Sequence, residues 1–351
     1  MTGTPSFAAM LRELRSQAGL TMDELAATSG VSARAISDME RGRSRRPQRR
    51  TIAALADALG LDLRQGSQLI AAARGRPLLP LPEDAEPFVG REAELTRLRQ
   101  LARQALGERT APVVVICGLG GTGKTALAVR AARSLAAEFP GGAHFADMSG
   151  GTGDDLLRAL GVPERDIPAG AEDRAGHYRE TVRERAALVV LDDAVDEARV
   201  RPLLPADGAV LTLVTSRRLL SGLEAVHRVH LGPLEPADAA RLVDGEVAAL
   251  CGFLPLALRV AAGQTAGDLA TADRRLDRLA DLGFPVNDVL ARPYRALTPP
   301  AALALRRLAR YEAVDDEDAL EELVEAGLAE IGSGGYRLHE LVRLFAGRSP
   351  G

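Results

Sequence analysis

The sequence is short of cysteine, of long apolar runs and of lysine, and the first two shortages exclude whole classes of protein. No stretch approaches the roughly 20 apolar residues that a membrane-spanning helix needs, and the N-terminus lacks the basic and then apolar pattern of a signal peptide. We therefore expect no membrane partner and a cytoplasmic location. The two cysteines, Cys117 and Cys251, are too few for a disulfide framework or a metal cluster, so a structural role is favoured for both.

Lysine occurs once, at Lys124, whereas the other 43 of the 44 basic residues are arginines. This lysine completes the pattern G-x-x-x-x-G-K-T over residues 118–125, between an apolar strand at 113–117 and a helix at 126–135. Such a P-loop binds phosphates through backbone N–H groups and the helix N-terminus, and its lysine position requires a compact ammonium. We expect Lys124 to bind the β- and γ-phosphates of ATP and Thr125 to coordinate Mg²⁺. The predicted cofactor-binding residues in this loop are Gly118, Gly120, Gly121, Thr122, Gly123, Lys124, Thr125 and Ala126.

Two further strand ends carry side chains suited to nucleotide chemistry. The apolar run 188–191 ends in Asp192 and Asp193, in the manner of a Walker B strand. Asp192 is predicted to be a Mg²⁺ ligand, and Asp193 the catalytic residue that orients or deprotonates the attacking water. Arg217 follows the apolar run 209–215, at the carboxyl end of a strand where open α/β sheets bind ligands, and is predicted to sense the γ-phosphate.

Helices alternate with four short apolar runs, 112–117, 142–147, 187–192 and 209–215, and this alternation predicts a parallel sheet with right-handed crossovers. After about Leu231 the pattern becomes helical, with helices expected over 236–243, 246–262 and 270–282. Near the C-terminus, a glycine-rich turn flanked by short strands precedes a closing helix over 338–345.

The N-terminal part differs from the rest in charge. Residues 1–76 hold 12 arginines against 7 acidic residues, a net charge of +5, although the whole chain has a net charge of −4. Helical periodicity and a capping box at Thr21 predict a helix-turn-helix over 21–40, with further helices over 51–59 and 64–73. Its second helix turns Arg34 outward to read a guanine edge, and an arginine run beside it suits phosphates. The predicted DNA-binding residues are Ser32, Ala33, Arg34, Ser37, Arg41 and Arg43.

Two sets of motifs resemble known families. Residues 7–60 resemble Xre/Cro-type helix-turn-helix domains, through Leu20-Thr21, Glu24-Leu25-Ala26, Gly30-Val31-Ser32 and the block 36–42. Residues 88–351 resemble the NB-ARC region of bacterial STAND regulators, the kind found beside antibiotic-pathway activators. The matching blocks are 88–92, the P-loop, 191–193, 215–217, 251–258 and 336–341.

The second resemblance implies roles for residues that composition alone does not select. Val89 and Arg91 would lie near the adenine and ribose, Pro255 would pack on the base, and His339 would contact the β-phosphate of bound ADP. The sequence also departs from that family, because 241–251 and 298–331 are short and Phe253 replaces a usual glycine. Relatives typically continue into repeats that sense a ligand or partner, and we expect none before the end at Gly351.

Together these observations predict a multidomain fold: an all-α helix-turn-helix domain, an α/β P-loop NTPase with a parallel sheet, a helical subdomain and a shortened winged-helix domain. The expected divisions are residues 1–75 for the DNA-binding domain, 76–87 for a proline-rich linker, 88–231 for the nucleotide-binding domain, 232–285 for the helical (ARC) subdomain and 286–351 for the winged-helix-like domain.

Our interpretation is an ATP/ADP-dependent transcriptional regulator. Nucleotide and Mg²⁺ would control conformation, assembly into a homo-oligomer in the ATP state, and binding to double-stranded operator DNA. Any ATP hydrolysis would be slow and serve as a reset. Two alternatives stay open: a slow ATPase acting as a signalling or defence STAND protein, and a nucleotide-insensitive repressor with a decayed NTPase scaffold. The signal, whether a protein or a small molecule, is open as well.

Overall fold

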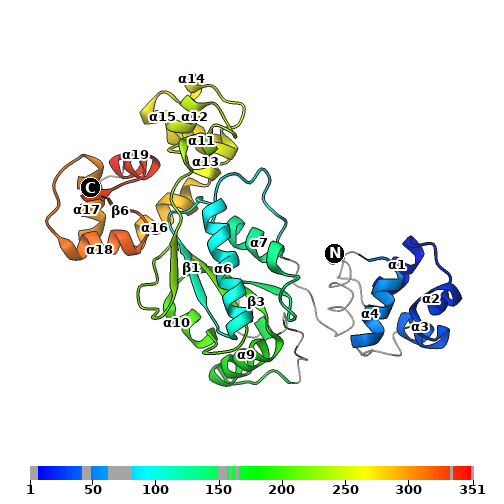
Figure 1. The fold of residues 1–351 in the computed structure, drawn as a ribbon. Helices are drawn as coiled ribbons and strands as arrows, with labels where there is room; N and C mark the ends of the chain where they lie inside the picture. Colours follow the sequence, from blue (N-terminus) through cyan, green and yellow to red (C-terminus); the bar gives the residue numbers. More distant parts are fainter. Residues whose placement is uncertain are drawn as a thin grey trace.

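The computed structural model describes residues 7–41, 49–61, 81–148, 156–157, 160, 162, 166–332 and 335–348. Figure 1 shows a group of N-terminal helices, a sheet covered by helices, and a further set of helices towards the C-terminus. This arrangement confirms the multidomain fold class, in which a helix-turn-helix part is followed by a P-loop ATPase-like part with a parallel sheet and by additional helices. None of the helices in the described ranges has the length and apolar character needed to cross a membrane.

The N-terminal helices are α1 (Phe7–Gln17), α2 (Met22–Ser29), α3 (Ala33–Glu40) and α4 (Arg49–Ala58). The predicted capping box is present, because the Thr21 side chain accepts a hydrogen bond from the Glu24 N–H while the Glu24 carboxylate accepts one from the Thr21 N–H. Gly30 ends α2 with a φ of 69°, a left-handed conformation that glycine adopts without strain. The helix predicted over 64–73 lies outside the described residues.

The central sheet contains five parallel strands: β1 (Val113–Cys117), β2 (Ala143–Asp147), β3 (Leu188–Ala194), β4 (Leu211–Ser216) and β5 (His227–His230). Their order is β2-β3-β4-β1-β5. The first four strands confirm the predicted runs, whereas β5 was missed by the sequence pattern. Because β1 and β3 both pair with β4, their carboxyl ends bring the P-loop, Asp192 and Arg217 to one edge of the sheet.

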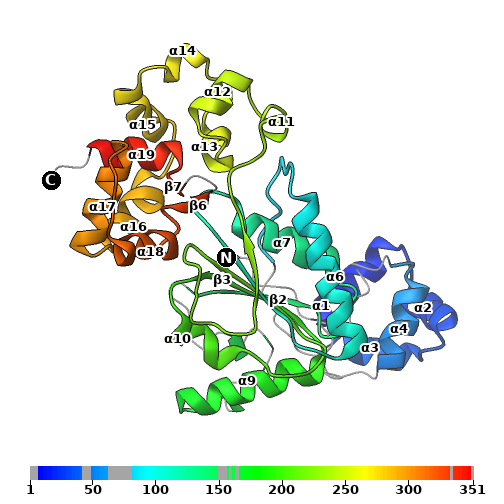
Figure 2. The same cartoon turned by 60° about the vertical axis from the view of Figure 1, so that its left-hand side comes forward.

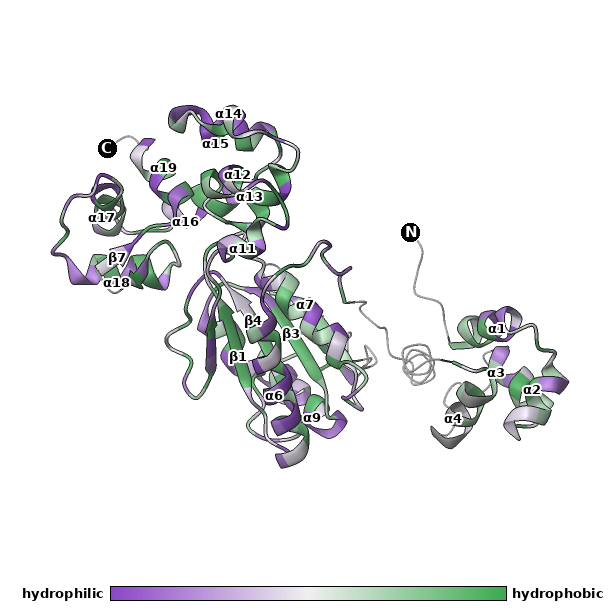
Figure 3. Cartoon of the chain, turned by 45° about the horizontal axis from the view of Figure 1, so that its top comes forward, coloured by the Kyte–Doolittle hydropathy of each residue, from purple (hydrophilic) through white to green (hydrophobic). Residues whose placement is uncertain are grey.

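Helices cover both faces of the sheet. In β1, Val114 and Ile116 pack with α6 (Glu92–Glu108) and α7 (Lys124–Leu135), while Val113, Val115 and Cys117 face the opposite side with α9 (Ala171–Arg185) and α10 (Glu197–Val200). Figure 2 shows the two helix pairs on opposite sides of the strands. The apolar colouring of β1 and β3 in Figure 3 matches strands that are buried on both faces.

Residues 81–87, at the end of the range predicted to be a linker, contact α7. Arg133 donates hydrogen bonds to the Pro82 carbonyl, and Arg130 makes an ion pair of 2.9 Å with Asp84. The Arg130 guanidinium also lies 4.8 Å from the centre of the Phe88 ring. Residues 81–88 therefore lie against α7.

Five short helices follow the sheet: α11 (Pro236–Ala239), α12 (Gly245–Leu250), α13 (Pro255–Val260), α14 (Ala266–Leu269) and α15 (Ala272–Asp281). The prediction of one helix over 246–262 was wrong. Gly252 and Phe253 have positive φ values of 61° and 56°, which end α12, and Pro255 begins α13 at a position that needs no backbone N–H.

The C-terminal part begins with a π-helical turn (Asn287–Ala291) and continues with α16 (Arg292–Arg295), α17 (Pro299–Ala309), α18 (Glu317–Glu325), β6 (Glu330–Gly332), β7 (Gly335–Arg337) and α19 (Glu340–Arg348). The β6–β7 pair and α19 confirm the predicted short strands and closing helix. One apolar cluster, including Leu258, Leu276, Leu305 and Leu341, joins this part to the helices before it. The division at 285/286 stays a prediction.

Candidate nucleotide-binding site

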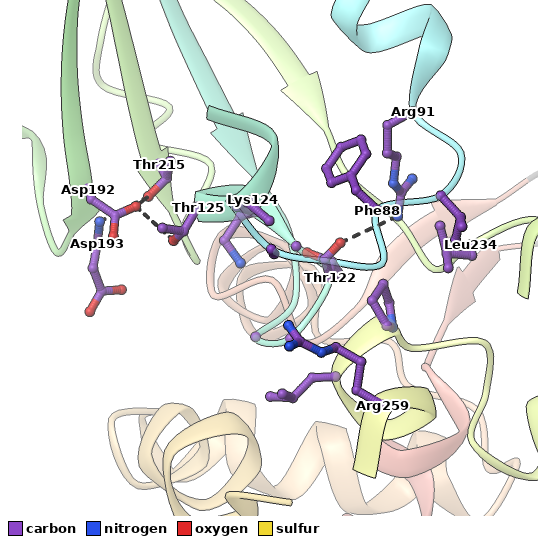
Figure 4. Close-up of a pocket in the computed structure, with 18 of the residues that line it drawn as sticks. Phe88, Arg91, Thr122, Lys124, Thr125, Asp192, Asp193, Thr215, Leu234 and Arg259 are labelled. Carbon is purple, nitrogen blue, oxygen red and sulfur yellow. Dashed lines mark hydrogen bonds between the residues drawn. The ribbon is translucent and has the colours of Figure 1, made fainter. Parts of the chain in front are cut away.

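A cavity of about 480 Å³ opens at the carboxyl ends of β1, β3 and β4. The P-loop residues 120–126 form its floor, and α13 supplies part of the opposite wall (Figure 4). The cavity brings together Val89, Arg91, Gly120, Gly121, Thr122, Gly123, Lys124, Thr125, Ala126, Asp192, Asp193, Arg217 and Pro255 from the predicted set. Gly118 and His339 are absent from the residues that line it.

Lys124 lies at the centre of the P-loop. Its ammonium donates hydrogen bonds of 2.9 Å to the Gly118 and Leu119 carbonyls, and the residue is 8% exposed. Burial, and then repulsion from Arg217, lowers the pKa of Lys124 to about 8. Gly118 thus contributes to the site through its carbonyl, which holds the lysine, rather than as part of the cavity wall.

Asp192 is held by two threonine hydroxyls. Thr125 Oγ1 donates to Asp192 Oδ1 at 2.8 Å, and Thr215 Oγ1 donates to the same oxygen at 2.5 Å. Burial raises the pKa of Asp192, while the two hydroxyl donors lower it. A hydroxyl and a carboxylate in contact supply the hard oxygen ligands that Mg²⁺ prefers, so these residues fit a magnesium site.

Thr215 also positions the next residue. Its Oγ1 accepts a hydrogen bond of 2.9 Å from the Asp193 N–H, and Asp193 has a φ of 51°, which is uncommon for a residue with a side chain. The Asp193 carboxylate lies 3.6 Å from the Arg217 guanidinium, which also donates to the Asp288 carbonyl of the π-helical turn. The predicted catalytic and sensor residues therefore form one ion pair at the edge of the cavity.

Arg91 ties three segments together at the other end of the cavity. Its guanidinium donates to the Gly232 carbonyl at 2.5 Å and to the Thr122 carbonyl at 3.4 Å, and it lies 3.5 Å from the Glu94 carboxylate. Burial lowers the pKa of Arg91, although nearby carboxylates oppose that shift. Arg91 thus links the start of α6 to the P-loop and to the segment that leaves the sheet.

His339 is bound to protein groups on both sides of its ring. Nδ1 accepts a hydrogen bond of 3.1 Å from the Leu341 N–H, so the ring proton lies on Nε2, which contacts the Gly252 carbonyl at 2.8 Å. Burial lowers the pKa of His339 and favours this neutral form.

Several residues of the cavity lie outside the predicted set, and two of them, Arg259 and Thr215, have side chains suited to a role in the site. Arg259 lines it from α13, is exposed, and makes no hydrogen bond or ion pair with any described residue. It follows the predicted base-packing Pro255 by one helical turn, a spacing that places both on one face of α13 and could have identified it. Thr215 lies in the block 215–217, but the sequence alone predicts no role for it, because its two hydrogen bonds depend on the pairing of β3 with β4.

The helix-turn-helix part exposes Arg34 on α3, while Ile36 and Met39 are buried. Ser32 caps α3 by accepting a hydrogen bond from the Ala35 N–H. Among the other predicted contacts, Ala33 and Ser37 are half-buried, Arg41 is exposed, and Arg43 lies outside the described residues.

One buried ion pair in this part was not predicted. Glu40 is 3% exposed. Its carboxylate accepts two hydrogen bonds from the Arg15 guanidinium, at 2.6 and 3.0 Å. This bidentate pair fixes the end of α3 against α1. It thereby sets the direction in which α3 presents its outer face.

Two family models match the chain. A model described as a helix-turn-helix domain matches residues 6–65, and a model described as an AAA ATPase domain matches residues 87–254, which implies nucleotide binding. Regulatory protein AfsR of Streptomyces coelicolor is 34% identical to this chain, over 83% of the chain and 37% of its own length. Regulatory protein AfsR of Streptomyces griseus is 35% identical, over 76% of the chain and 32% of its own length. The chain thus spans about a third of the length of these curated relatives. The Walker-type ATPase paby2304 of Pyrococcus abyssi aligns with 76% of this chain and 98% of its own, at 13% identity and a TM-score of 0.48.

Proposed function

Because the chain joins a helix-turn-helix domain to an AAA ATPase domain and is homologous to the AfsR regulatory proteins, we propose that it is a transcriptional regulator controlled by ATP and ADP. Its nucleotide-binding region is an NB-ARC module of the STAND type, with 232–285 as the helical subdomain and 286–351 as a short winged-helix domain. The observation that carries the proposal is the single cavity in which Lys124, Thr125 and Asp192 meet Arg259 of α13.

Different residues of this cavity bind different parts of the nucleotide. The P-loop N–H groups and Lys124 hold the phosphates, while Thr125 and Asp192 hold Mg²⁺. Bound Mg²⁺ neutralises charge on the phosphates. Asp193 orients the attacking water, and the Asp193–Arg217 pair keeps hydrolysis slow until the arginine turns to the γ-phosphate. Val89 and Pro255 border the base, and Arg91 lies on the ribose side.

The segment that follows β4 is connected to the C-terminal part through Asp288 and Glu325. Arg217 donates to the Asp288 carbonyl, and Glu325 of α18 accepts hydrogen bonds from the Leu220 N–H at 3.1 Å and the Ser221 hydroxyl at 2.8 Å. A ligand that draws Arg217 to its γ-phosphate breaks the first contact, whereas ADP leaves it intact. Differential affinity of ATP and ADP for the two arrangements is what a nucleotide switch requires.

His339 acts in the ADP-bound form of this switch. In this structure the His339 Nε2–H donates its hydrogen bond to the Gly252 carbonyl. The same N–H would donate to the β-phosphate of ADP. In the ATP form the helix-turn-helix domains of two chains come together, so that Arg34 and its neighbours on α3 read two half-sites of an operator.

The nucleotide half of this proposal is tested by the affinity of ADP and ATP with and without Mg²⁺. Asp192→Asn removes a metal ligand but leaves the phosphate loop intact, so Mg²⁺-dependent affinity should fall about tenfold while Mg²⁺-free affinity is unchanged. Asp281→Asn, at an exposed aspartate at the end of α15, is the control and should bind both nucleotides normally. Equal losses with and without Mg²⁺ would contradict the assignment of Asp192.

A further inference from the structure

A second cavity, of about 350 Å³, adjoins the nucleotide cavity. Asp193 and Arg217, which lie 3.6 Å apart, contribute to the walls of both cavities. The other walls come from the end of β3, from α16 and from the end of α18. The volume lies in the range of roughly 300–1,000 Å³ that small organic molecules occupy in proteins.

Half of the residues that line this cavity are apolar or small. They are Ala194, Val195, Pro293, Ala296, Leu297 and Ala326. Val195 is 43% exposed, which makes it one of the few large apolar side chains in the described residues that are open to solvent. An apolar ligand body would cover this side chain and remove that area from water.

The charged residues of the cavity are balanced, with three arginines and three carboxylates, but most of them are already engaged. Glu322 accepts hydrogen bonds from the Thr298 N–H at 2.8 Å and its hydroxyl at 2.5 Å, and Glu325 binds Leu220 and Ser221. Arg217 is paired with Asp193. Arg292, the first residue of α16, is exposed and makes no hydrogen bond or ion pair with any described residue.

We propose that this second cavity is an effector site for a small monocarboxylate with an apolar body, whose carboxylate pairs with Arg292. The guanidinium can hold a carboxylate through two parallel hydrogen bonds. A monoanion matches the one cation that lacks a partner, whereas a dianionic phosphate would bring a second negative charge close to Asp193, Glu322 and Glu325.

The position of the site connects it to the nucleotide. A ligand in the second cavity borders the same Asp193–Arg217 pair that the γ-phosphate would meet, so each ligand changes the affinity of the other by the same factor. This coupling rests on the proposed function, but binding of the carboxylate does not, because Arg292 and the apolar wall lie outside the nucleotide cavity.

The test is equilibrium dialysis of radiolabelled octanoate against the full chain, first without nucleotide and then with saturating ATP and Mg²⁺. We expect saturable binding of one octanoate per chain, competition by unlabelled octanoate, and much weaker competition by octylamine, octanol or octyl phosphate. Arg292→Ala should weaken binding about tenfold, as expected for the loss of a charge-assisted contact at a partly open site. Arg274→Ala, at an exposed arginine of α15, should leave it unchanged.

A second variant tests whether a loss of binding in Arg292→Ala results from impaired folding. Val195→Asp places a carboxylate on the apolar wall and should also weaken octanoate binding, with thermal unfolding monitored for both variants. Equal competition by octanol or octylamine, or unchanged binding in Arg292→Ala, would overturn the site. Octanoate binding that is normal without nucleotide in a protein that fails to bind ADP would support the site and reject the nucleotide proposal instead.

Discussion

Replacing Thr215 by valine removes one hydroxyl at the point where the P-loop, β3 and β4 meet. The residue is 1% exposed, and its hydroxyl donates to Asp192 at 2.5 Å and accepts from the Asp193 N–H at 2.9 Å. Valine has nearly the same shape, so the substitution leaves no cavity. The substitution does remove the hydrogen bond to the Asp192 carboxylate, and it leaves the Asp193 N–H without a partner. Together these losses should lower the free energy of unfolding by about 2–3 kcal/mol.

A loss of that size should lower the melting temperature of the nucleotide-binding part by roughly 5–10 °C in calorimetry without nucleotide or Mg²⁺. Thr212→Val is the matched control, because Thr212 lies on the same strand, is also 1% exposed, and makes no side-chain hydrogen bond with the described residues. It should change the free energy of unfolding by less than about 0.5 kcal/mol. Melting temperatures of the two variants within about 2 °C of each other would refute the reasoning.

Three further predictions concern Lys124, Glu40 and Glu325. The pKa of Lys124 is lowered to about 8 and its charged form binds phosphate, so the affinity for ADP should weaken as the pH rises through 8. At pH 8.5, calorimetry in buffers of different ionisation enthalpy should detect the uptake of roughly 0.7 proton per ADP bound. Binding of ADP without proton uptake would contradict this prediction. Glu40→Gln strips Arg15 of its anionic partner and should destabilise the helix-turn-helix domain by about 2–3 kcal/mol, measured by thermal circular dichroism against the exposed-site control Glu13→Gln. Glu325→Ala removes the acceptor of the Leu220 N–H, so that amide should exchange with solvent at least about tenfold faster, whereas Glu321→Ala on the exposed face of the same helix should not change it.

The sequence predicted those parts of the fold that local patterns determine. The strands β1 to β4 are continuous apolar runs, and the P-loop follows a fixed spacing of glycines and Lys124. The strand β5 carries two histidines and an arginine, with only Val229 buried, so it shows neither an apolar run nor a buried alternation that would identify it. The break between α12 and α13 depends on the positive φ of Phe253, a residue type that rarely signals a helix end.

The remaining parts of the site depend on contacts between distant segments. Thr215 acquires its role only when β4 pairs with β3, and Glu40 is buried only because Arg15 of α1 meets it. His339 was assigned to the β-phosphate from family resemblance alone, and its hydrogen bond to Gly252 could not be deduced from spacing. Such pairings bring together residues that are far apart in the sequence, and a single sequence carries little signal for them.

The central claim is that nucleotide state controls DNA binding, and it is tested by measuring the affinity of the full chain for operator-length DNA from upstream of its own gene. The measurement is made without nucleotide, with ADP and Mg²⁺, and with ATP and Mg²⁺ at one salt concentration, because phosphate contacts make DNA affinity depend strongly on salt. The account predicts that ATP and ADP give different affinities or stoichiometries, that Lys124→Ala removes this difference, and that Arg34→Ala removes specific binding in every state. Identical binding of the operator in all three nucleotide states would contradict it.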